Sequence, residues 1–346
     1  MDAFNNIYLS ETIIVMLFLF VFFVCLAATF IYRKIALRIG ILANPNLRTL
    51  HKNSIPNGGG IVFSLVFIIC IFILFLLGQL SENIFKIFFY GAFVATLFGF
   101  LDDLKDISAS KKMLVQILLS GWTLFCLDGG VLFGFEKIPS IISLALSMFF
   151  LVWMINAYNF MDGIDGMAIS GATFVSGLMA LSLQLTNGSP ELILILLILM
   201  SCTSALMVFN WPPATIFMGD AGSIFLGYIF GAIILISIIN DDVSIWTWLV
   251  IFGYFFADTS MTQILRLILV KKWYKAHRSH AYQNLARITD SHFKVTMSVT
   301  TYHLVWISPL TFWSVLQPEM AIIPAILAVT PGLFFTYKYG PTLSSS

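Results

Sequence analysis

Long apolar segments recur along almost the whole chain, and polar residues are concentrated in the connections between them. A helix that spans a bilayer needs about 20 mostly apolar residues, which gives about eleven spans here. The centres of these segments are Phe22, Ile68, Val94, Leu119, Phe149, Phe174, Leu199, Phe230, Phe256, Trp306 and Ala328. The pattern predicts an all-α fold, a polytopic membrane helix bundle that forms one integral membrane domain over residues 1–346.

The basic residues alternate from one connection to the next, as the positive-inside rule requires. With the amino terminus outside, all but Lys86 and Lys137 of the 18 Lys and Arg residues fall in or beside cytoplasmic loops. A miscount by one span would break this alternation from the error onward. We therefore expect the amino terminus outside and the carboxyl terminus in the cytoplasm, with any chemistry on the cytoplasmic face.

Composition agrees with a membrane protein and excludes several partners. Hydrophobic residues make up 59% of the chain and charged residues 10%, against about 25% charged residues in soluble domains. The net charge is +1, and no basic block is present that would bind nucleic acid. The four cysteines lie far apart without a CxxC pair, so neither a disulfide framework nor a zinc site is indicated.

Two adjacent acids, Asp102 and Asp103, end the third apolar segment. They lie at the negative end of the helix dipole and therefore need a compensating cation. One interpretation is a solvated loop neutralised by Lys105, Lys111 and Lys112. The other is functional, because adjacent carboxylates raise one another's pKa and can supply a base near neutrality.

Amides and acids recur every third residue at the end of the fifth segment, at Asn156, Asn159, Asp162 and Asp165. This spacing places the four groups on one side of a helix, so they converge on a common space. An EF-hand does not fit because the later ligands of its loop are missing. A solvated helix face is the alternative.

The segment 210–223 contains two prolines and then Gly219 and Asp220 before the next apolar run. Mg²⁺ binds one or two protein carboxylates together with substrate phosphates and water. The acids on three inner segments fit that requirement. Capping of the next helix is the alternative role for Asp220.

The last long inner connection combines His277, Arg278 and His280 with several lysines. Arg and Lys bind phosphate, and a basic anchor for anionic lipid also explains the lysines. It does not explain the two histidines, which are largely neutral at pH 7. Asp258 is an acid inside an apolar segment, and we expect it to have a structural partner such as Arg266 or an amide of a neighbouring helix.

Together these segments resemble the polyprenyl-phosphate N-acetylhexosamine-1-phosphate transferase family, which includes phospho-MurNAc-pentapeptide transferase. The motifs LDDLKD, NAYNFMDGIDG, NWPPATIFMGDAGS and HRSH occur in the family's order between Lys52 and Gln283. The resemblance implies transfer of a sugar 1-phosphate from a UDP-sugar to undecaprenyl phosphate at the cytoplasmic face of the bacterial inner membrane. It also implies release of UMP and a need for Mg²⁺, with Mn²⁺ as a substitute. HRSHAYQ resembles the branch that starts O-antigen of lipopolysaccharide or related glycans, so a pentapeptide substrate is not expected.

The resemblance also implies roles for individual residues. Asp102 and Asp103 would deprotonate the lipid phosphate or bind metal, and Asp220 would be the main Mg²⁺ ligand. Asp162, counted with the catalytic acids, would line the nucleotide-sugar site beside Asn159. The other implied substrate contacts are Lys52, Asp165, Asn210 and Phe217 at the uridine, Lys112 at a phosphate, and His277, Arg278 and His280 near the diphosphate.

The chemistry requires two anions to react, so Mg²⁺ and basic residues must offset their repulsion and hold them in line. We expect Asp102 to act as base in a direct displacement, and a covalent phospho-Asp intermediate is the alternative. A transporter or channel would instead place polar residues near the bilayer midplane, and a membrane scaffold would not need clustered acids. Expected partners are a UDP-N-acetyl sugar, polyprenyl phosphate, membrane lipid and a second copy in a homodimer.

Overall fold

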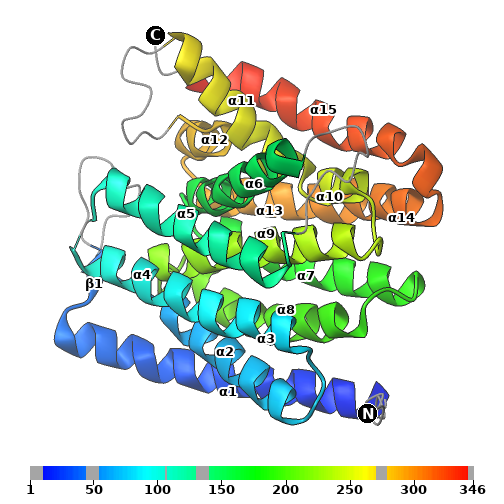
Figure 1. Cartoon of the computed structure of the whole chain (residues 1–346). Coiled ribbons are helices and arrows are strands. Elements are labelled where there is room, and N and C mark those ends of the chain that lie inside the picture. The colour runs from blue at the N-terminus through cyan, green and yellow to red at the C-terminus, as the bar shows by residue number, and fades with distance from the viewer. Residues whose placement is uncertain (1–10, 44–53, 106, 130–139, 270–278, 342–346) are drawn as a thin grey trace.

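The computed structural model describes residues 11–43, 54–105, 107–129, 140–269 and 279–341. This part of the chain is predominantly helical, as predicted, and its long helices lie side by side in a bundle (Figure 1). The single sheet among the described residues is a two-stranded antiparallel ribbon, in which Leu42 pairs with Pro56 and Ala43 with Ile55.

The elements follow one another in chain order through short connections. The first half comprises α1 (Glu11–Ile39), β1 (Leu42–Ala43), β2 (Ile55–Pro56), α2 (Gly60–Leu76), α3 (Glu82–Lys86), the π-helical turn η1 (Ile87–Gly91), α4 (Ala92–Lys105), α5 (Ala109–Cys126), α6 (Ser140–Met161) and α7 (Met167–Leu185). The second half comprises α8 (Pro190–Asn210), α9 (Asp220–Ile239), α10 (Ile245–Ile251), α11 (Gly253–Leu269), α12 (Ala281–Thr289), α13 (His292–Tyr302), the π-helical turn η2 (His303–Ile307), α14 (Ser308–Leu316), the short 3₁₀ turn η3 (Pro318–Met320) and α15 (Ile322–Tyr339).

Every predicted span centre falls in a helical segment, but the segments differ in their capacity to cross a bilayer. Seven described helices are long and apolar enough to span, and α2 is a shorter apolar helix. The remaining centres lie in α5, in α11 and in the continuous segment from α13 through η2 to α14. The structure therefore confirms a polytopic helical membrane protein, while about eleven crossings and the sidedness of the termini stay predictions.

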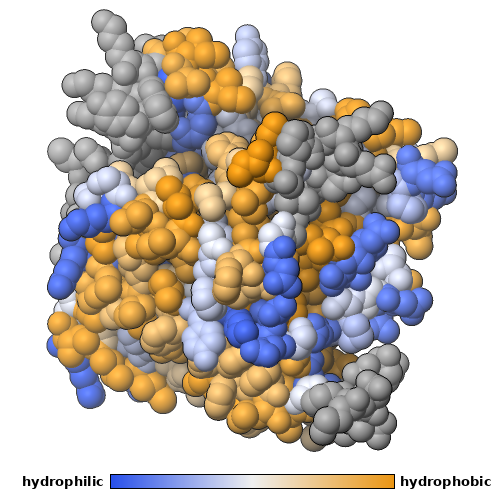
Figure 2. Space-filling model, in the orientation of Figure 1, coloured by the Kyte–Doolittle hydropathy of each residue, from blue (hydrophilic) through white to orange (hydrophobic). Residues whose placement is uncertain are grey.

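Large apolar side chains cover the outside of the bundle. Phe20, Phe125, Ile141 and Ile268 are exposed to more than half of their surface, and Figure 2 shows hydrophobic residues over much of one side of the molecule. An exposed apolar surface of this extent is typical of contact with lipid rather than water.

Helix α9 forms the centre of the bundle and is buried along nearly its whole length. Helices that pack in a membrane approach closely where their interface residues are small. A Cβ atom on Gly60 of α2 would lie 2.1 Å from the backbone nitrogen of Gly222, and one on Gly99 of α4 would lie 2.3 Å from the carbonyl oxygen of Asp220. These glycines therefore let α2 and α4 pack directly against the first turns of α9.

Close packing at this end brings the ends of several helices together. Helix α4 ends with its two acids beside the first turn of α9, and β1 lies at the same end of the bundle (Figure 1). At the opposite end, the Glu191 carboxylate accepts hydrogen bonds from the backbone nitrogen and hydroxyl of Ser81, at 2.6 and 3.2 Å. The polar residues of interest are thus concentrated at one end of the molecule.

Candidate active site

The start of α9 is capped by the carboxylate of Asp103. Its two oxygens accept hydrogen bonds from the backbone nitrogens of Asp220, at 2.9 Å, and Ala221, at 3.0 Å, and Asn57 donates a third at 3.1 Å. A negative charge at this position complements the positive end of the helix dipole. Gly219 adopts φ +74°, and a Cβ there would lie 2.6 Å from both Asp103 oxygens. The cap that the sequence analysis considered for Asp220 is therefore supplied by Asp103.

Asp102 and Asp220 share a cation, Lys112. The Lys112 ammonium lies 3.2 Å from Asp220 Oδ2 and makes an ion pair with Asp102 Oδ2. Asp102 is buried, and its other oxygen accepts a hydrogen bond from the backbone nitrogen of Ile107 at 2.7 Å. The compensating cation expected beside the acid pair is thus present, and it is carried by α5.

Two of the four polar positions expected on one side of a helix, Asn156 and Asn159, lie in α6. The expectation is wrong for Asp162 and Asp165, because the helix ends at Met161 before Gly163 and Gly166. Asn159 donates hydrogen bonds to Asp220 Oδ1 at 2.8 Å and to the Ser223 hydroxyl at 2.9 Å. One turn earlier, Asn156 and Gln116 exchange two amide hydrogen bonds of 2.8 and 3.2 Å. Helices α5, α6 and α9 are therefore joined through these amides directly behind the acids.

Asp165 is held in a network between the loop after α6 and the loop before α9. Its carboxylate accepts a hydrogen bond from the Ala214 backbone nitrogen at 3.0 Å and lies 3.0 Å from Nδ1 of His292. In the same region, Asn210 accepts a hydrogen bond from the Gly166 nitrogen at 3.1 Å and donates one to the Ile216 carbonyl at 2.8 Å. These two polar side chains position the loops that carry them.

Asp162 differs from the other pocket acids in its hydrogen bonding. Its carboxylate receives no hydrogen bond within the described part of the chain, and it lines the same pocket as Asp220. Desolvation raises the pKa of this carboxyl well above its usual value, and the neighbouring charges of Asp220, Asp103 and Asp165 raise it further. Its raised pKa makes Asp162 a candidate proton acceptor in the pocket.

Six of the ten predicted site residues that the structure describes line one pocket of about 260 Å³. Its walls include four acids from three separate segments and two further predicted residues: Asp103, Asp162, Asp165, Asp220, Asn210 and Phe217. Asp102, Lys112 and Asn159 do not line the pocket but contact Asp220 or its partners. The structure thus brings together residues that lie more than 100 positions apart in the sequence.

His280 does not line this pocket. It is 2% exposed, and its Nδ1 lies 3.4 Å from the buried carboxylate of Asp258. Asp258 also accepts hydrogen bonds from the backbone nitrogens of Ala281, at 3.1 Å, and Tyr282, at 3.4 Å, so it caps α12. The expectation of an amide partner for Asp258 is confirmed, whereas a substrate contact of His280 stays a prediction.

Helix α12 in turn supports the pocket loop. The Tyr282 hydroxyl donates a 2.6 Å hydrogen bond to the carbonyl of Phe160, and a Cβ on Gly163 would lie 2.2 Å from that hydroxyl. The motif glycine beside Asp162 is therefore needed for this close approach. His280 is placed to influence the site through α12.

The donor set fits a magnesium ion that is held partly by substrate. Within the described residues, no three His, Cys, Asp or Glu side chains are arranged to form a complete metal site. Mg²⁺ commonly takes only one or two protein carboxylates and completes its coordination with phosphate and water. Asp220 supplies such oxygens in a pocket whose acids would otherwise repel an anionic substrate.

Two residues of the pocket were not singled out by the sequence analysis. His292 begins α13, far from every motif, and Asn57 follows the first inner connection. Neither occurs in a pattern that would have distinguished it from an ordinary polar residue. The predicted contacts Lys52, His277 and Arg278 lie outside the described residues.

A polar pocket lies at one end of a membrane helix bundle and collects acids from several helix ends. This arrangement is typical of a membrane enzyme rather than of a transporter or channel. Residues 84–238 match the profile of the family described as glycosyl transferase family 4. A "probable undecaprenyl-phosphate N-acetylglucosaminyl 1-phosphate transferase" of Bacillus subtilis is 29% identical over 303 residues, which cover 84% of this chain and 82% of that protein.

Other relatives carry the name phospho-N-acetylmuramoyl-pentapeptide-transferase. The one from Streptococcus equi subsp. zooepidemicus is 30% identical and aligns over 65% of this chain and 71% of its own length. The one from Chlamydia caviae is also 30% identical, over 54% and 61%. The chain belongs to the polyprenyl-phosphate N-acetylhexosamine-1-phosphate transferases of glycosyl transferase family 4.

Proposed function

We propose that this enzyme transfers an N-acetylhexosamine 1-phosphate from a UDP-sugar to polyprenyl phosphate, releases UMP and so starts a lipid-linked glycan such as O-antigen. The observation that carries the proposal is the pocket formed by Asp103, Asp162, Asp165 and Asp220 at one end of the bundle. We place this end at the cytoplasmic face, where the nucleotide sugar is available. A transporter is not favoured, because the polar groups gather at a helix end rather than along a path through the bundle.

The reaction requires attack by an oxygen of the lipid phosphate on the sugar-bearing phosphorus of the UDP-sugar. A new phosphorus–oxygen bond forms, the bond to the bridging oxygen breaks, and UMP leaves with that oxygen. Mg²⁺, when bound, offsets the charge of the diphosphate, and Asp220 would hold it. Lys112 supplies a second positive charge, next to Asp220.

The described contacts favour Asp162 over Asp102 for accepting a proton from the lipid phosphate. Asp102 is buried and ion-paired with Lys112. Asp162 lines the pocket, and burial together with the neighbouring carboxylates raises the pKa of its carboxyl, which favours acceptance of a proton. We propose that Asp102 instead positions Lys112, and that Asp103 keeps the first turn of α9 in place.

A panel of UDP-N-acetyl sugars tests the activity. The purified full chain, with undecaprenyl phosphate and Mg²⁺, should release UMP with at least one of them, and EDTA should stop the release. UMP release that does not depend on the lipid phosphate, or no release with any sugar of the panel, would contradict the proposal.

Substitution of the proposed metal ligand gives a sharper test. Asp220→Ala should lower the rate of UMP release at least about 100-fold, because the diphosphate charge is no longer offset. Asp241→Asn is the matched control, since Asp241 is exposed and lies about 30 Å away beyond the other end of α9. Equal rates in the two variants would show that Asp220 does not take part.

A further inference from the structure

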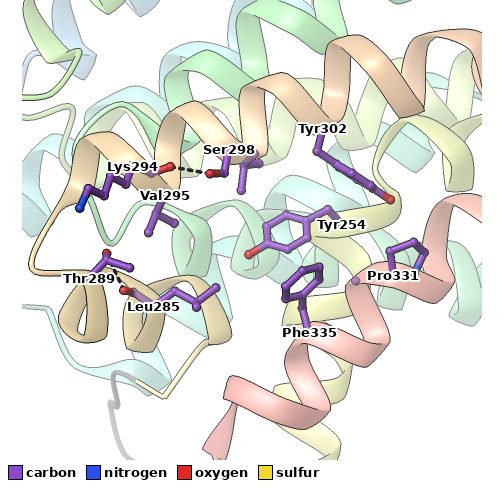
Figure 3. A pocket seen from close by; sticks show the side chains of 11 residues that line it. Tyr254, Leu285, Thr289, Lys294, Val295, Ser298, Tyr302, Pro331 and Phe335 are labelled. Atoms are coloured by element: carbon purple, nitrogen blue, oxygen red, sulfur yellow. Dashed lines mark hydrogen bonds between the residues drawn. The ribbon is translucent and has the colours of Figure 1, made fainter.

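A second cavity, largely apolar, lies on the outer side of α13. It has a volume of about 350 Å³ and is enclosed by α12, α13 and α15, with Tyr254 of α11 at its back. Figure 3 shows Lys294 at one end of the cavity, Tyr302 at the other, and Phe335 and Pro331 of α15 facing α13 across it. The first pocket, lined by Asp103, Asp162, Asp165 and Asp220, is called the carboxylate pocket below. None of its lining residues lines this second cavity.

The cavity lies where α13 and α15 diverge from a contact near Tyr302 (Figure 3). The Tyr302 hydroxyl donates a 2.8 Å hydrogen bond to the Ala328 carbonyl, and Trp306 donates one of 3.1 Å to the Leu327 carbonyl. Towards Lys294 the two helices separate, and Leu285 and Thr289 of α12 close the space between them (Figure 3).

The lining does not favour a polar ligand inside the cavity. The hydroxyls of Thr289, Ser298 and Tyr302 each donate a hydrogen bond to a backbone carbonyl, at 2.7 to 2.8 Å. The other wall residues are mostly hydrocarbon, and an apolar cavity of this size is a poor site for water. The ligand that fits is therefore itself a hydrocarbon chain.

Lys294 indicates the headgroup of that ligand. It is the charged residue that lines the cavity, and it lies two positions after His292 of the carboxylate pocket, at the same end of the bundle. From Lys294 to Tyr302 the helix rises about 12 Å, which is close to the thickness of about 15 Å for half of a hydrocarbon core. Met297 on α13 and Phe334 on α15 are exposed beside it, as expected next to lipid.

We propose that this cavity binds one acyl chain of an anionic phospholipid, whose phosphate lies near the Lys294 ammonium. This phospholipid is distinct from the polyprenyl phosphate that reacts. Successive helix positions are about 100° apart, so Lys294 and His292 point to nearly opposite sides of α13. A phosphate at Lys294 therefore lies across the helix from the acids.

Native mass spectrometry of the purified full chain, with equal amounts of phosphatidylglycerol and phosphatidylcholine, tests the site. The unsubstituted chain should retain one phosphatidylglycerol. Ser298→Phe should lose it because the ring fills the cavity. Lys294→Gln should reduce the preference for phosphatidylglycerol about five-fold, the effect of one lysine near a membrane surface.

Two matched variants serve as controls. Thr330→Phe adds the same ring on the exposed side of α15, and Lys338→Gln removes an exposed lysine that does not line the cavity. Both should retain phosphatidylglycerol as the unsubstituted chain does. Equal retention of the two lipids by the unsubstituted chain, or retention by Ser298→Phe, would overturn the proposal. So would displacement of phosphatidylglycerol by undecaprenyl phosphate together with a raised KM for that lipid in Ser298→Phe, because the cavity would then be the acceptor site.

Discussion

At the scale of single residues, identical carboxylates around one pocket have different surroundings and therefore different roles. Asp103 accepts three N–H hydrogen bonds, and Asp102 is ion-paired with Lys112. Asp165 is held by Ala214 and His292. Asp162 receives no hydrogen bond from the described chain, so its charge is the least compensated. An acid kept in this state contributes to reactivity at the expense of stability.

Asp162→Asn should therefore lower activity and raise stability. Between the unfolded pKa of about 3.9 and the raised folded pKa, the folded chain binds more protons than the unfolded chain. The free energy of unfolding consequently falls as pH rises through this window. In EDTA at pH 8, Asp162→Asn should melt about 1–3 °C above the unsubstituted chain, and at pH 4 the two should be equal. UMP release should fall at least about 100-fold.

Asp128→Asn is the control for this pair of measurements. Asp128 is exposed and follows the far end of α5, in a left-handed conformation that Asn also tolerates. It should change neither the melting temperature at pH 8 nor the rate. A destabilised Asp162→Asn at pH 8 would show that the carboxylate is stabilised by contacts beyond those described here.

At the scale of elements, the site depends on how α9 begins. Its first turn packs against Gly60 and Gly99, and its exposed N–H groups are satisfied by Asp103 from α4. The same turn presents Asp220 to Lys112 and Asn159. A small shift of this helix end would therefore disturb the cap, the ion pair and the amide contact together.

Gly219→Ala tests this dependence, with Gly40→Ala as its control. Both glycines have positive φ, of +74° and +79°, so each substitution strains the backbone. The strain is larger at Gly219, whose ψ of −179° lies in a region essentially restricted to glycine. Only at Gly219 does the new Cβ meet another group, the Asp103 carboxylate, whereas nothing lies within 4 Å at Gly40. Gly219→Ala should melt lower than Gly40→Ala and lose most activity, and equal behaviour of the two would contradict the role of the Asp103 cap.

At the scale of the whole molecule, the bundle carries different polar groups at its two ends. In Figure 1, α1 begins at the end of the bundle opposite to the end where α15 finishes. Such an arrangement is expected for an odd number of crossings. The carboxylate pocket and Lys294 share one end, and the Glu191 contact with Ser81 belongs to the other.

Cysteine labelling in intact cells tests the orientation. Asp241 and Lys105 are exposed at opposite ends of the bundle, and the native cysteines are buried or half-buried. A membrane-impermeant maleimide should label Asp241→Cys in intact cells and Lys105→Cys only after permeabilisation. The reverse pattern, or labelling of both from one side, would contradict the proposed sidedness.

The sequence by itself determined the class of fold and most members of the site. Long apolar runs can satisfy their backbone in lipid only as helices or closed barrels, and runs of this length indicate helices. The three-residue period is a local property, and it correctly placed Asn156 and Asn159 on one side of α6. Asp162 and Asp165 lie instead in the loop that follows Met161. The acids of the other motifs were recognisable because charges are rare beside apolar segments.

The tertiary structure decided the surroundings of each acid, because these depend on partners that are distant in the chain. Asp103 caps α9 only since glycines let α4 approach it, and His292 joins the pocket through the packing of α13 against the loop after α6. His280, which the sequence motif placed near the diphosphate, contacts Asp258 instead of lining the pocket. Local patterns fix helices and their faces, whereas desolvation, charge compensation and access arise only when those faces meet.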